Sequence, residues 1–226
     1  MSSDIRTVLF DLDGTLADTA PDLAYALNEV RREQGLEAMP YEQIRPVVSH
    51  GGIALIRLGF QLEPEQPQFE PLRDRLLQIY VNNIATQTTL FDGMETVLEQ
   101  LEHRGMLWGV VTNKPAWLTD PLMQQMGLAS RAATIISGDT LPQRKPHPAP
   151  MLLACEQTGS IAEQCLYIGD AERDIEAGRA AGMKTMVALF GYIEEHDRPE
   201  QWGADVMVKK PLAILDWLDS HSTISN

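Results

Sequence analysis

The 226-residue sequence predicts an α/β fold: a parallel sheet flanked by helices, with an all-helical insertion. Short apolar, β-rich runs recur along the chain, and each is followed by a stretch of helical periodicity, the pattern of a doubly wound domain. The runs are apolar on both faces, as buried parallel strands are. We expect these strands at 8–10, 107–111, 134–136, 165–168, 185–189 and 206–208.

The insertion is predicted from the length of one connection. About 95 residues separate the first two expected strands, far more than the 10 to 12 or so that a crossover requires. Four stretches of helical periodicity lie in the first part of this connection, at 23–34, 41–48, 53–58 and 71–84. We therefore predict a helical cap domain at 18–87, inserted into a core domain that comprises 1–17 and 88–226.

Composition excludes several classes of protein. The chain carries 18 basic and 32 acidic residues and no basic block, so we expect no nucleic-acid partner. No apolar run reaches membrane-spanning length and the start lacks a signal-peptide pattern, so we expect a cytoplasmic protein without a membrane partner. Cys155 and Cys165 lack a metal or redox spacing and are interpreted as buried hydrophobic residues. An acidic protein that acts on an anionic substrate must supply positive charge locally, from a metal or a few basic residues.

Two pairs of acids follow expected strands. Asp11 and Asp13 come after the first strand, and Asp170 and Asp174 come after the strand at 165–168. Turn formation by Asp-Gly is the alternative explanation for the first pair, and the preference of acids for helix starts is the alternative for the second. The carboxyl ends of parallel strands form the edge at which ligands bind. Carboxylates gathered there disfavour joint ionisation unless a cation joins them, and oxygen ligands suit Mg²⁺.

Three further polar residues also follow strands. Thr112 and Asn113 come after the second strand and precede Pro115, which favours a helix start. A hydroxyl beside a helix N-terminus can bind phosphate, with a simple N-cap as the alternative. Lys145 lies in a proline-fixed loop, where a solvated lysine is the alternative and Arg144 competes for the same role. Together the groups supply a nucleophile, an acid or base, metal ligands, a phosphate cradle and a cation.

These groups, in this order and strand context, resemble the motif set of the haloacid dehalogenase superfamily of phosphatases. The resemblance covers essentially the whole chain and implies a Rossmann-like core with a cap of the first type, C1. Five further segments resemble the phosphoglycolate phosphatase-like branch, and within it most resemble the N-acetylmuramic acid 6-phosphate phosphatases of cell-wall recycling. These segments are 90–94, 108–115, 174–182, 191–193 and 202–206.

The resemblance implies a role for each strand-end residue. Asp11 is the implied nucleophile, which forms an aspartyl-phosphate, and Asp13 is the implied general acid and base. Mg²⁺ is the implied cofactor, bound by Asp11, the backbone carbonyl of Asp13, Asp170 and Asp174, the last either directly or through a water. Three residues are the implied phosphate ligands: Thr112, Asn113 and Lys145.

The resemblance also gives the cap the task of closing over the site and selecting the substrate. Our candidate substrate loop follows a cap helix and consists of Ser49, His50, Gly51 and Gly52. Arg45 and Arg57 are candidate partners for a substrate carboxylate, with a solvated helix face as the alternative for both.

The expected activity is hydrolysis of a small phosphorylated metabolite by a phosphomonoesterase. On the resemblance we expect N-acetylmuramic acid 6-phosphate as the substrate, with 2-phosphoglycolate as the alternative. Asp13 and Asp170 argue against a haloalkanoate dehalogenase, and Asp13 with the insertion argues against a non-catalytic phosphoacceptor module. A phosphomutase shares the same core, so it stays open as an interpretation. We expect a monomer or a homodimer.

Overall fold

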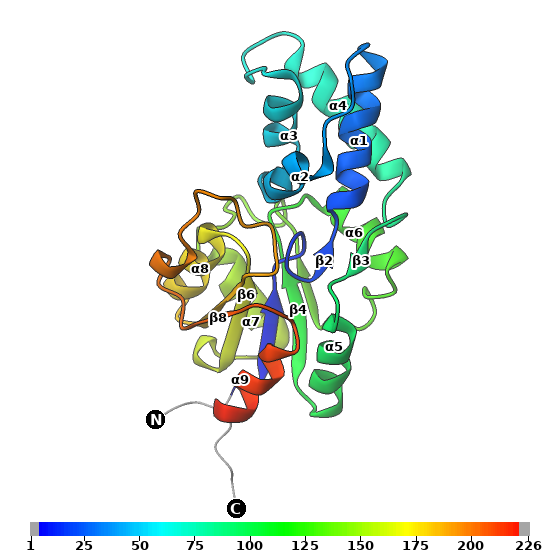
Figure 1. Cartoon of the computed structure of the whole chain (residues 1–226). Coiled ribbons are helices and arrows are strands. Elements are labelled where there is room, and N and C mark those ends of the chain that lie inside the picture. Colours follow the sequence, from blue (N-terminus) through cyan, green and yellow to red (C-terminus); the bar gives the residue numbers. More distant parts are fainter. Residues whose placement is uncertain (1–4, 222–226) are drawn as a thin grey trace, which may run out of the picture.

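The computed structural model describes residues 5–221 and contains a six-stranded parallel sheet with helices on both faces (Figure 1). The strands follow one another across the sheet in the order β5-β4-β1-β6-β7-β8. Their bounds are β1 (Thr7–Phe10), β4 (Leu107–Val111), β5 (Thr134–Ile136), β6 (Cys165–Gly169), β7 (Lys184–Ala188) and β8 (Val206–Val208). The predicted α/β fold is confirmed.

The order of the sheet reverses beside β1. The chain runs from β1 to β4 and β5 on one side, then crosses to β6, β7 and β8 on the other. Thr7 of β1 therefore pairs with Leu107 of β4 and with Cys165 of β6. In open α/β sheets the crevice at such a switch point, outside the carboxyl ends of the strands, is where ligands bind. The segments after β1, β4 and β6 meet at this crevice.

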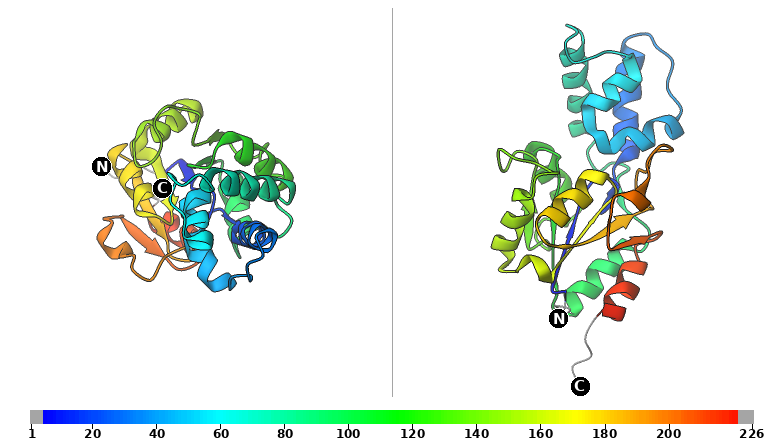
Figure 2. Two further views of the ribbon diagram at one scale, coloured as in Figure 1. Left: turned by 90° about the horizontal axis from the view of Figure 1, so that it is seen from above. Right: turned by 90° about the vertical axis from the view of Figure 1, so that its left-hand side faces the viewer.

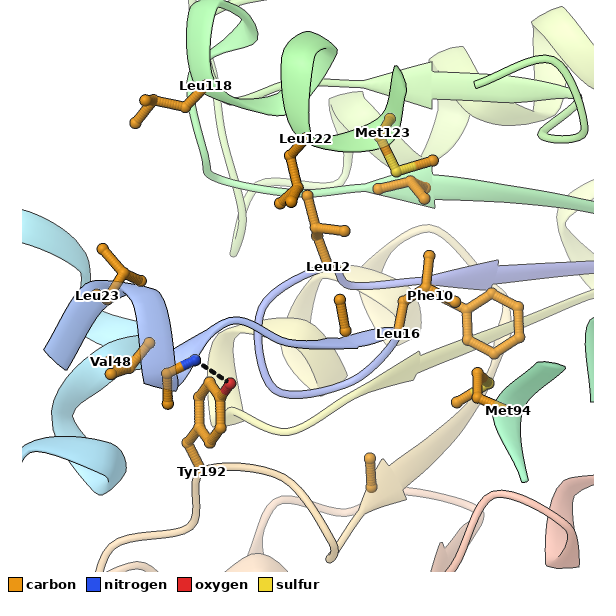
Figure 3. Packing of buried hydrophobic residues seen from close by; sticks show 14 of the residues in the cluster. Phe10, Leu12, Leu16, Leu23, Val48, Met94, Leu118, Leu122, Met123 and Tyr192 are labelled. Atoms are coloured by element: carbon orange, nitrogen blue, oxygen red, sulfur yellow. Dashed lines mark hydrogen bonds between the residues drawn. The ribbon is translucent and has the colours of Figure 1, made fainter. Parts of the chain in front are cut away.

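Two groups of helices cover the two faces of the sheet. The helices are α5 (Met94–His103), α6 (Ala116–Gln125), α7 (Ala149–Thr158), α8 (Glu172–Ala180) and α9 (Ala213–His221), with short 3₁₀ turns η2 (Ala162–Gln164) and η3 (Pro199–Gln201). Side chains alternate along β1. Val8 and Phe10 pack with residues of α5, α6 and α9, whereas Leu9 packs with residues of α7 and α8. Figure 3 shows Phe10 between Met94 of α5 and the α6 side of the core. Every residue of β1 is buried, as a central parallel strand requires.

The helical insertion follows β1 and stands at the carboxyl end of the sheet (Figures 1 and 2). It consists of α1 (Ala20–Glu33), α2 (Tyr41–Ile44), the 3₁₀ helix η1 (Arg45–His50), α3 (Gly51–Phe60) and α4 (Phe69–Asn82). The single helix predicted at 41–48 is divided into α2 and η1, because Pro46 has no amide hydrogen to continue the α-helical ladder. Within residues 5–221, no helix is long and apolar enough to cross a bilayer.

A two-stranded antiparallel ribbon lies at the base of the insertion. It pairs β2 (Ala17–Asp18) with β3 (Thr89–Leu90), so the chain enters and leaves the insertion side by side. The buried carboxylate of Asp22, in the first turn of α1, fixes the returning chain. It accepts hydrogen bonds from the amides of Gln87 and Thr88 and from the Thr88 hydroxyl, at 2.8 to 3.1 Å.

Candidate active site

The loop after β1 presents Asp11 at the carboxyl end of the sheet. The Asp11 amide extends the sheet by donating to Ile168 O at 2.8 Å, and the carboxyl group is buried. The loop folds back where the Gly14 amide donates to Ala17 O at 3.0 Å. Gly14 has a φ of +84°, and a Cβ at this position would clash with the carboxylate of Asp170. Glycine is therefore required for the loop to approach Asp170.

Lys145 is the buried cation of the site. Its Nζ lies 2.7 Å from Asp11 Oδ1, 2.8 Å from Asp174 Oδ1 and 2.9 Å from the Tyr167 hydroxyl, and its side chain is only 1% exposed. Asn113 fixes the backbone of Lys145, since its Nδ2 donates to Lys145 O and its Oδ1 accepts from Lys145 N, both at 3.0 Å. In this structure Asn113 therefore acts on the site through the lysine loop.

The buried carboxylates are incompletely neutralised by Lys145. Burial alone would lower the pKa of the Lys145 ammonium, but Asp11 and Asp174 raise it above its ordinary value. Burial raises the pKa of Asp11 above its ordinary value, although Lys145 acts in the opposite direction. Burial, reinforced by the charges of Asp11 and Asp174, raises the pKa of Asp170 to about 7. Asp11, Asp170 and Asp174 provide three carboxylates, and the nearby positive charges are those of Lys145 and the half-buried Arg173, so the cluster favours binding of a further cation.

The three carboxylates are placed to share that cation. Asp11, Asp170 and Asp174 are all buried and each offers an oxygen within 4.8 Å of the others. Oδ1 of Asp170 is buried and has no hydrogen-bond partner among the described residues. Such an orphaned oxygen is costly unless it binds a cation. The all-oxygen donor set fits a hard metal ion.

Asp13 is held by groups on both sides of the boundary between the sheet and the insertion. Its Oδ1 accepts from Lys114 Nζ at 2.9 Å and from the Thr19 hydroxyl at 2.6 Å. Lys114 is nearly buried, and its ammonium lies 4.6 Å from the centre of the Tyr80 ring, which α4 contributes. This network fixes the orientation of the Asp13 carboxylate beside Asp11.

Thr112 continues β4 to the edge of the sheet. Its amide donates to Ile136 O at 2.9 Å, and its hydroxyl oxygen accepts from the Lys114 amide at 3.1 Å. Helix α6 begins three residues after Asn113, at Ala116, whose amide donates to Asp139 Oδ1 at 2.8 Å. The first amide of this helix therefore already has an acceptor within the protein.

A comparison with family models identifies the chain. Residues 8–188, which include every strand-end residue described above, match the model of the haloacid dehalogenase-like hydrolases. The chain belongs to this family.

Individual relatives are similar to this hydrolase over nearly its full length. A phosphoglycolate phosphatase from Xanthomonas campestris pv. campestris is 47% identical over 206 residues, 91% of this chain and 93% of that protein. An N-acetylmuramic acid 6-phosphate phosphatase from Pseudomonas putida is 44% identical over 216 residues, 96% of this chain and 97% of that protein. The crystal structure of a predicted phosphoglycolate phosphatase from Haemophilus somnus 129pt superposes with a TM-score of 0.84 at 26% identity, covering 96% of this chain and 99% of that chain. The predicted enzyme class, a phosphoric monoester hydrolase of this family, is confirmed.

The candidate substrate loop of the hydrolase contacts the side of the site that carries Asp170. The Ser49 hydroxyl donates to Asp170 Oδ2 at 3.0 Å, and His50 Nε2 lies 2.6 Å from Glu194 Oε1. Gly51 and Gly52 open α3. The two candidate arginines differ in their contacts: Arg45 donates to the carbonyls of Phe190 and Gly191, and Arg57 pairs with Glu63 inside the insertion.

A cavity of about 270 Å³ lies beside these contacts in the hydrolase. Ser49 and His50 of the insertion line it together with Asp170, Arg173 and Tyr192 of the core. A surface groove of about 590 Å³, which Trp217 and other residues line, contains none of the predicted site residues. The smaller cavity is therefore the one that belongs to the site.

Sequence reasoning did not single out three residues that the structure places in the site of the hydrolase. Lys114 contacts Asp13, Arg173 donates to Ser49 O at 2.7 Å, and the Tyr192 amide donates to Asp170 Oδ2 at 2.8 Å. All three follow strands of the sheet within a few residues. The predicted residues Asp174 and Lys145 lie farther from the ends of their strands than these three do, so the strand-end criterion covered these positions without selecting them.

Proposed function

We propose that this hydrolase is a magnesium-dependent phosphomonoesterase that works through an aspartyl-phosphate on Asp11. One observation carries the proposal: Asp11 directly follows β1, and the ammonium of Lys145 contacts the carboxylates of both Asp11 and Asp174. A nucleophile, a counter-charge and metal ligands then lie within one buried cluster. Covalent catalysis by a carboxylate divides hydrolysis into two easier steps.

In the first proposed step, a carboxylate oxygen of Asp11 attacks phosphorus while the bond from phosphorus to the substrate oxygen breaks. Lys145 holds Oδ1 of Asp11, which orients the other oxygen of that carboxylate for attack. Asp13 gives its proton to the departing oxygen. In the second step Asp13 takes a proton from the attacking water, the Asp11–phosphorus bond breaks, and inorganic phosphate leaves. Lys114 and Thr19 keep Asp13 in position for both transfers.

The metal ligands in this proposal are Asp11, the backbone carbonyl of Asp13, Asp170 and Asp174. Bound Mg²⁺ supplies positive charge that offsets the carboxylates and the phosphate dianion. Of the three predicted phosphate ligands Thr112, Asn113 and Lys145, two contact the phosphate in this proposal: Thr112 through its hydroxyl and Lys145 through its ammonium. Asn113 supports this role by fixing the Lys145 backbone at both its amide and its carbonyl.

The helical insertion acts as a cap over the site, and we assign it to 18–87, with 1–17 and 88–226 as the core. The ribbon of β2 and β3 supports these limits because it joins the two ends of the insertion. Closure of the cap excludes water from the first step and selects the substrate, with Ser49 to Gly52 as the proposed recognition loop.

We propose N-acetylmuramic acid 6-phosphate as the substrate, with 2-phosphoglycolate as the alternative. Relatives named for each activity match the chain over nine-tenths of its length or more, and both substrates are phosphomonoesters that carry a carboxylate. The chemistry of the core site is common to both, so the cap decides between them.

One kinetic panel tests the reaction and the substrate together. Phosphate release from N-acetylmuramic acid 6-phosphate, 2-phosphoglycolate and a hexose 6-phosphate is measured with and without Mg²⁺, and kcat/KM is compared. We expect magnesium-dependent release and the highest kcat/KM for the first compound. A tenfold preference for 2-phosphoglycolate would reverse the substrate assignment, and phosphoryl transfer to a second sugar hydroxyl without phosphate release would identify a mutase.

A further inference from the structure

The two oxygens of Asp170 have different environments. Oδ2 accepts hydrogen bonds from the Tyr192 amide at 2.8 Å and from the Ser49 hydroxyl at 3.0 Å. Oδ1 is buried and has no hydrogen-bond partner among residues 5–221. A carboxylate whose one oxygen is held by donors presents the other in a fixed direction, as supporting hydrogen bonds do for metal ligands. The orientation of Asp170 thus depends on one donor from the core and one from the insertion.

Ser49 belongs to η1, and both ends of η1 are attached to the core. At one end, Arg173 of α8 donates to Ser49 O at 2.7 Å. At the other end, Arg45 donates to two carbonyls of the loop after β7, at 3.1 and 3.2 Å, and its guanidinium lies 4.8 Å from the centre of the Tyr192 ring. These contacts place η1 against two segments of the core: the one before α8, which contains Asp170, and the one at Tyr192, which donates a hydrogen bond to Asp170.

The Ser49 contact is possible only while the insertion is docked. Ser49 and Asp170 are 121 residues apart in sequence, and the covalent connections of the insertion run through the β2–β3 ribbon instead. Movement of the insertion away from the sheet would leave Tyr192 as the donor to Oδ2. We propose that Ser49 is a positioning residue of the metal site, so that cation binding and docking of the insertion stabilise each other.

This linkage has two measurable sides, because a coupling free energy acts equally on both equilibria. If docking of Ser49 improves the affinity for Mg²⁺, then Mg²⁺ must shift the insertion towards its docked position by the same factor. The inference rests on the metal site of the proposed function and adds a residue from outside the sheet to it.

The first test measures Mg²⁺ affinity by isothermal titration calorimetry on the full chain. Loss of a hydrogen bond to a metal ligand typically weakens metal binding by about 10- to 100-fold, and we expect Ser49→Ala to fall in this range. Ser49→Thr keeps the hydroxyl and should bind Mg²⁺ close to the wild-type affinity. Ser160→Ala, which removes a hydroxyl bonded to Thr7 on the core, is the matched control and should leave Mg²⁺ affinity unchanged.

The second test follows docking directly. Fluorophores on Glu65→Cys in the insertion and Lys209→Cys in the core report their separation by energy transfer, since both positions are exposed and Cys155 and Cys165 are buried. Mg²⁺ should shift the transfer efficiency of the otherwise wild-type chain, and Ser49→Ala should diminish this shift.

The outcomes separate this inference from the proposed function. If the wild-type chain binds Mg²⁺ and Ser49→Ala binds it with the same affinity, the role of Ser49 is overturned and the proposed function is not. A separation that does not respond to Mg²⁺ would overturn the linkage. Failure of the wild-type chain to bind Mg²⁺ at all would overturn both this inference and the magnesium dependence of the proposed function.

Discussion

Replacement of Lys145 by methionine tests whether the ammonium is the counter-charge of the buried carboxylates. The substitution keeps an unbranched side chain that is one atom shorter and removes a charge that lies 2.7 Å from Asp11 Oδ1 and 2.8 Å from Asp174 Oδ1. Removing one partner of a buried ion pair leaves an uncompensated charge, which typically costs about 3 to 5 kcal/mol. We expect Lys145→Met to lose this much free energy of unfolding in the absence of metal, and to lose phosphatase activity in the presence of Mg²⁺.

The assay is urea denaturation followed by tryptophan fluorescence, with EDTA and with excess Mg²⁺. Lys184→Met is the matched control, because Lys184 forms an exposed ion pair with Asp205 and such pairs contribute about 1 kcal/mol or less. The double variant Lys145→Met/Asp11→Asn should recover much of the loss in EDTA, since it removes one uncompensated carboxylate. Bound Mg²⁺ at a hundredfold excess over its Kd should add about 2.7 kcal/mol to the stability of any variant that binds it.

The reasoning is refuted by a specific result. If Lys145→Met loses no more free energy of unfolding in EDTA than Lys184→Met does, the ammonium does not compensate buried charge. A Lys145→Met variant that keeps wild-type turnover would likewise contradict its proposed role at the phosphate.

Three further predictions concern other parts of the molecule. Asp13→Asn should lower kcat by about 10² to 10⁴ while Mg²⁺ binding in calorimetry is retained, and unchanged turnover would contradict its role as acid and base. Tyr192→Phe removes the hydroxyl that donates to Asp18 and accepts from the Ala20 amide, so urea denaturation should show a loss of about 1 to 3 kcal/mol; a loss below that range would argue against this link. Burial acts to raise the pKa of Asp205, but hydrogen bonds from Lys184 and Thr185 outweigh it and lower the pKa, so the stability that Asp205 contributes is present at neutral pH and lost as the pH falls through its lowered pKa. The difference in unfolding free energy between wild type and Asp205→Asn should therefore shrink on acidification, and a constant difference from neutral to acid pH would refute the assignment.

Sequence patterns place the candidate residues that come after strands at one edge of the sheet. The apolar runs predict the strands, and the carboxyl ends of parallel strands share one edge, so the sequence alone predicts that Asp11, Asp170 and Lys145 lie close together. In the structure, Asp11, Asp170 and Asp174 each offer an oxygen within 4.8 Å of the others, and Lys145 contacts Asp11 and Asp174. Strand propensity is a local property, which is why it could be predicted along the chain.

Contacts between distant segments could not be predicted in this way. The bonds from Lys114 to Asp13 and from Ser49 to Asp170 join residues 101 and 121 positions apart. No periodicity or short motif encodes such a pair, because it depends on how the insertion sits on the sheet. The division of the helix at 41–48 was also missed, although Pro46 was a local signal for it.

The ribbon of β2 and β3 determines where the insertion can be replaced. The chain leaves the six-stranded sheet and returns to it at one place, so the insertion between Asp18 and Thr89 leaves the order of the strands unchanged. The insertion can be exchanged or lengthened without altering the strand order of the sheet. The junction at the ribbon is therefore the natural point at which to exchange one insertion for another, and a new insertion would have to replace the hydrogen bonds that Thr19 and Ser49 donate to Asp13 and Asp170.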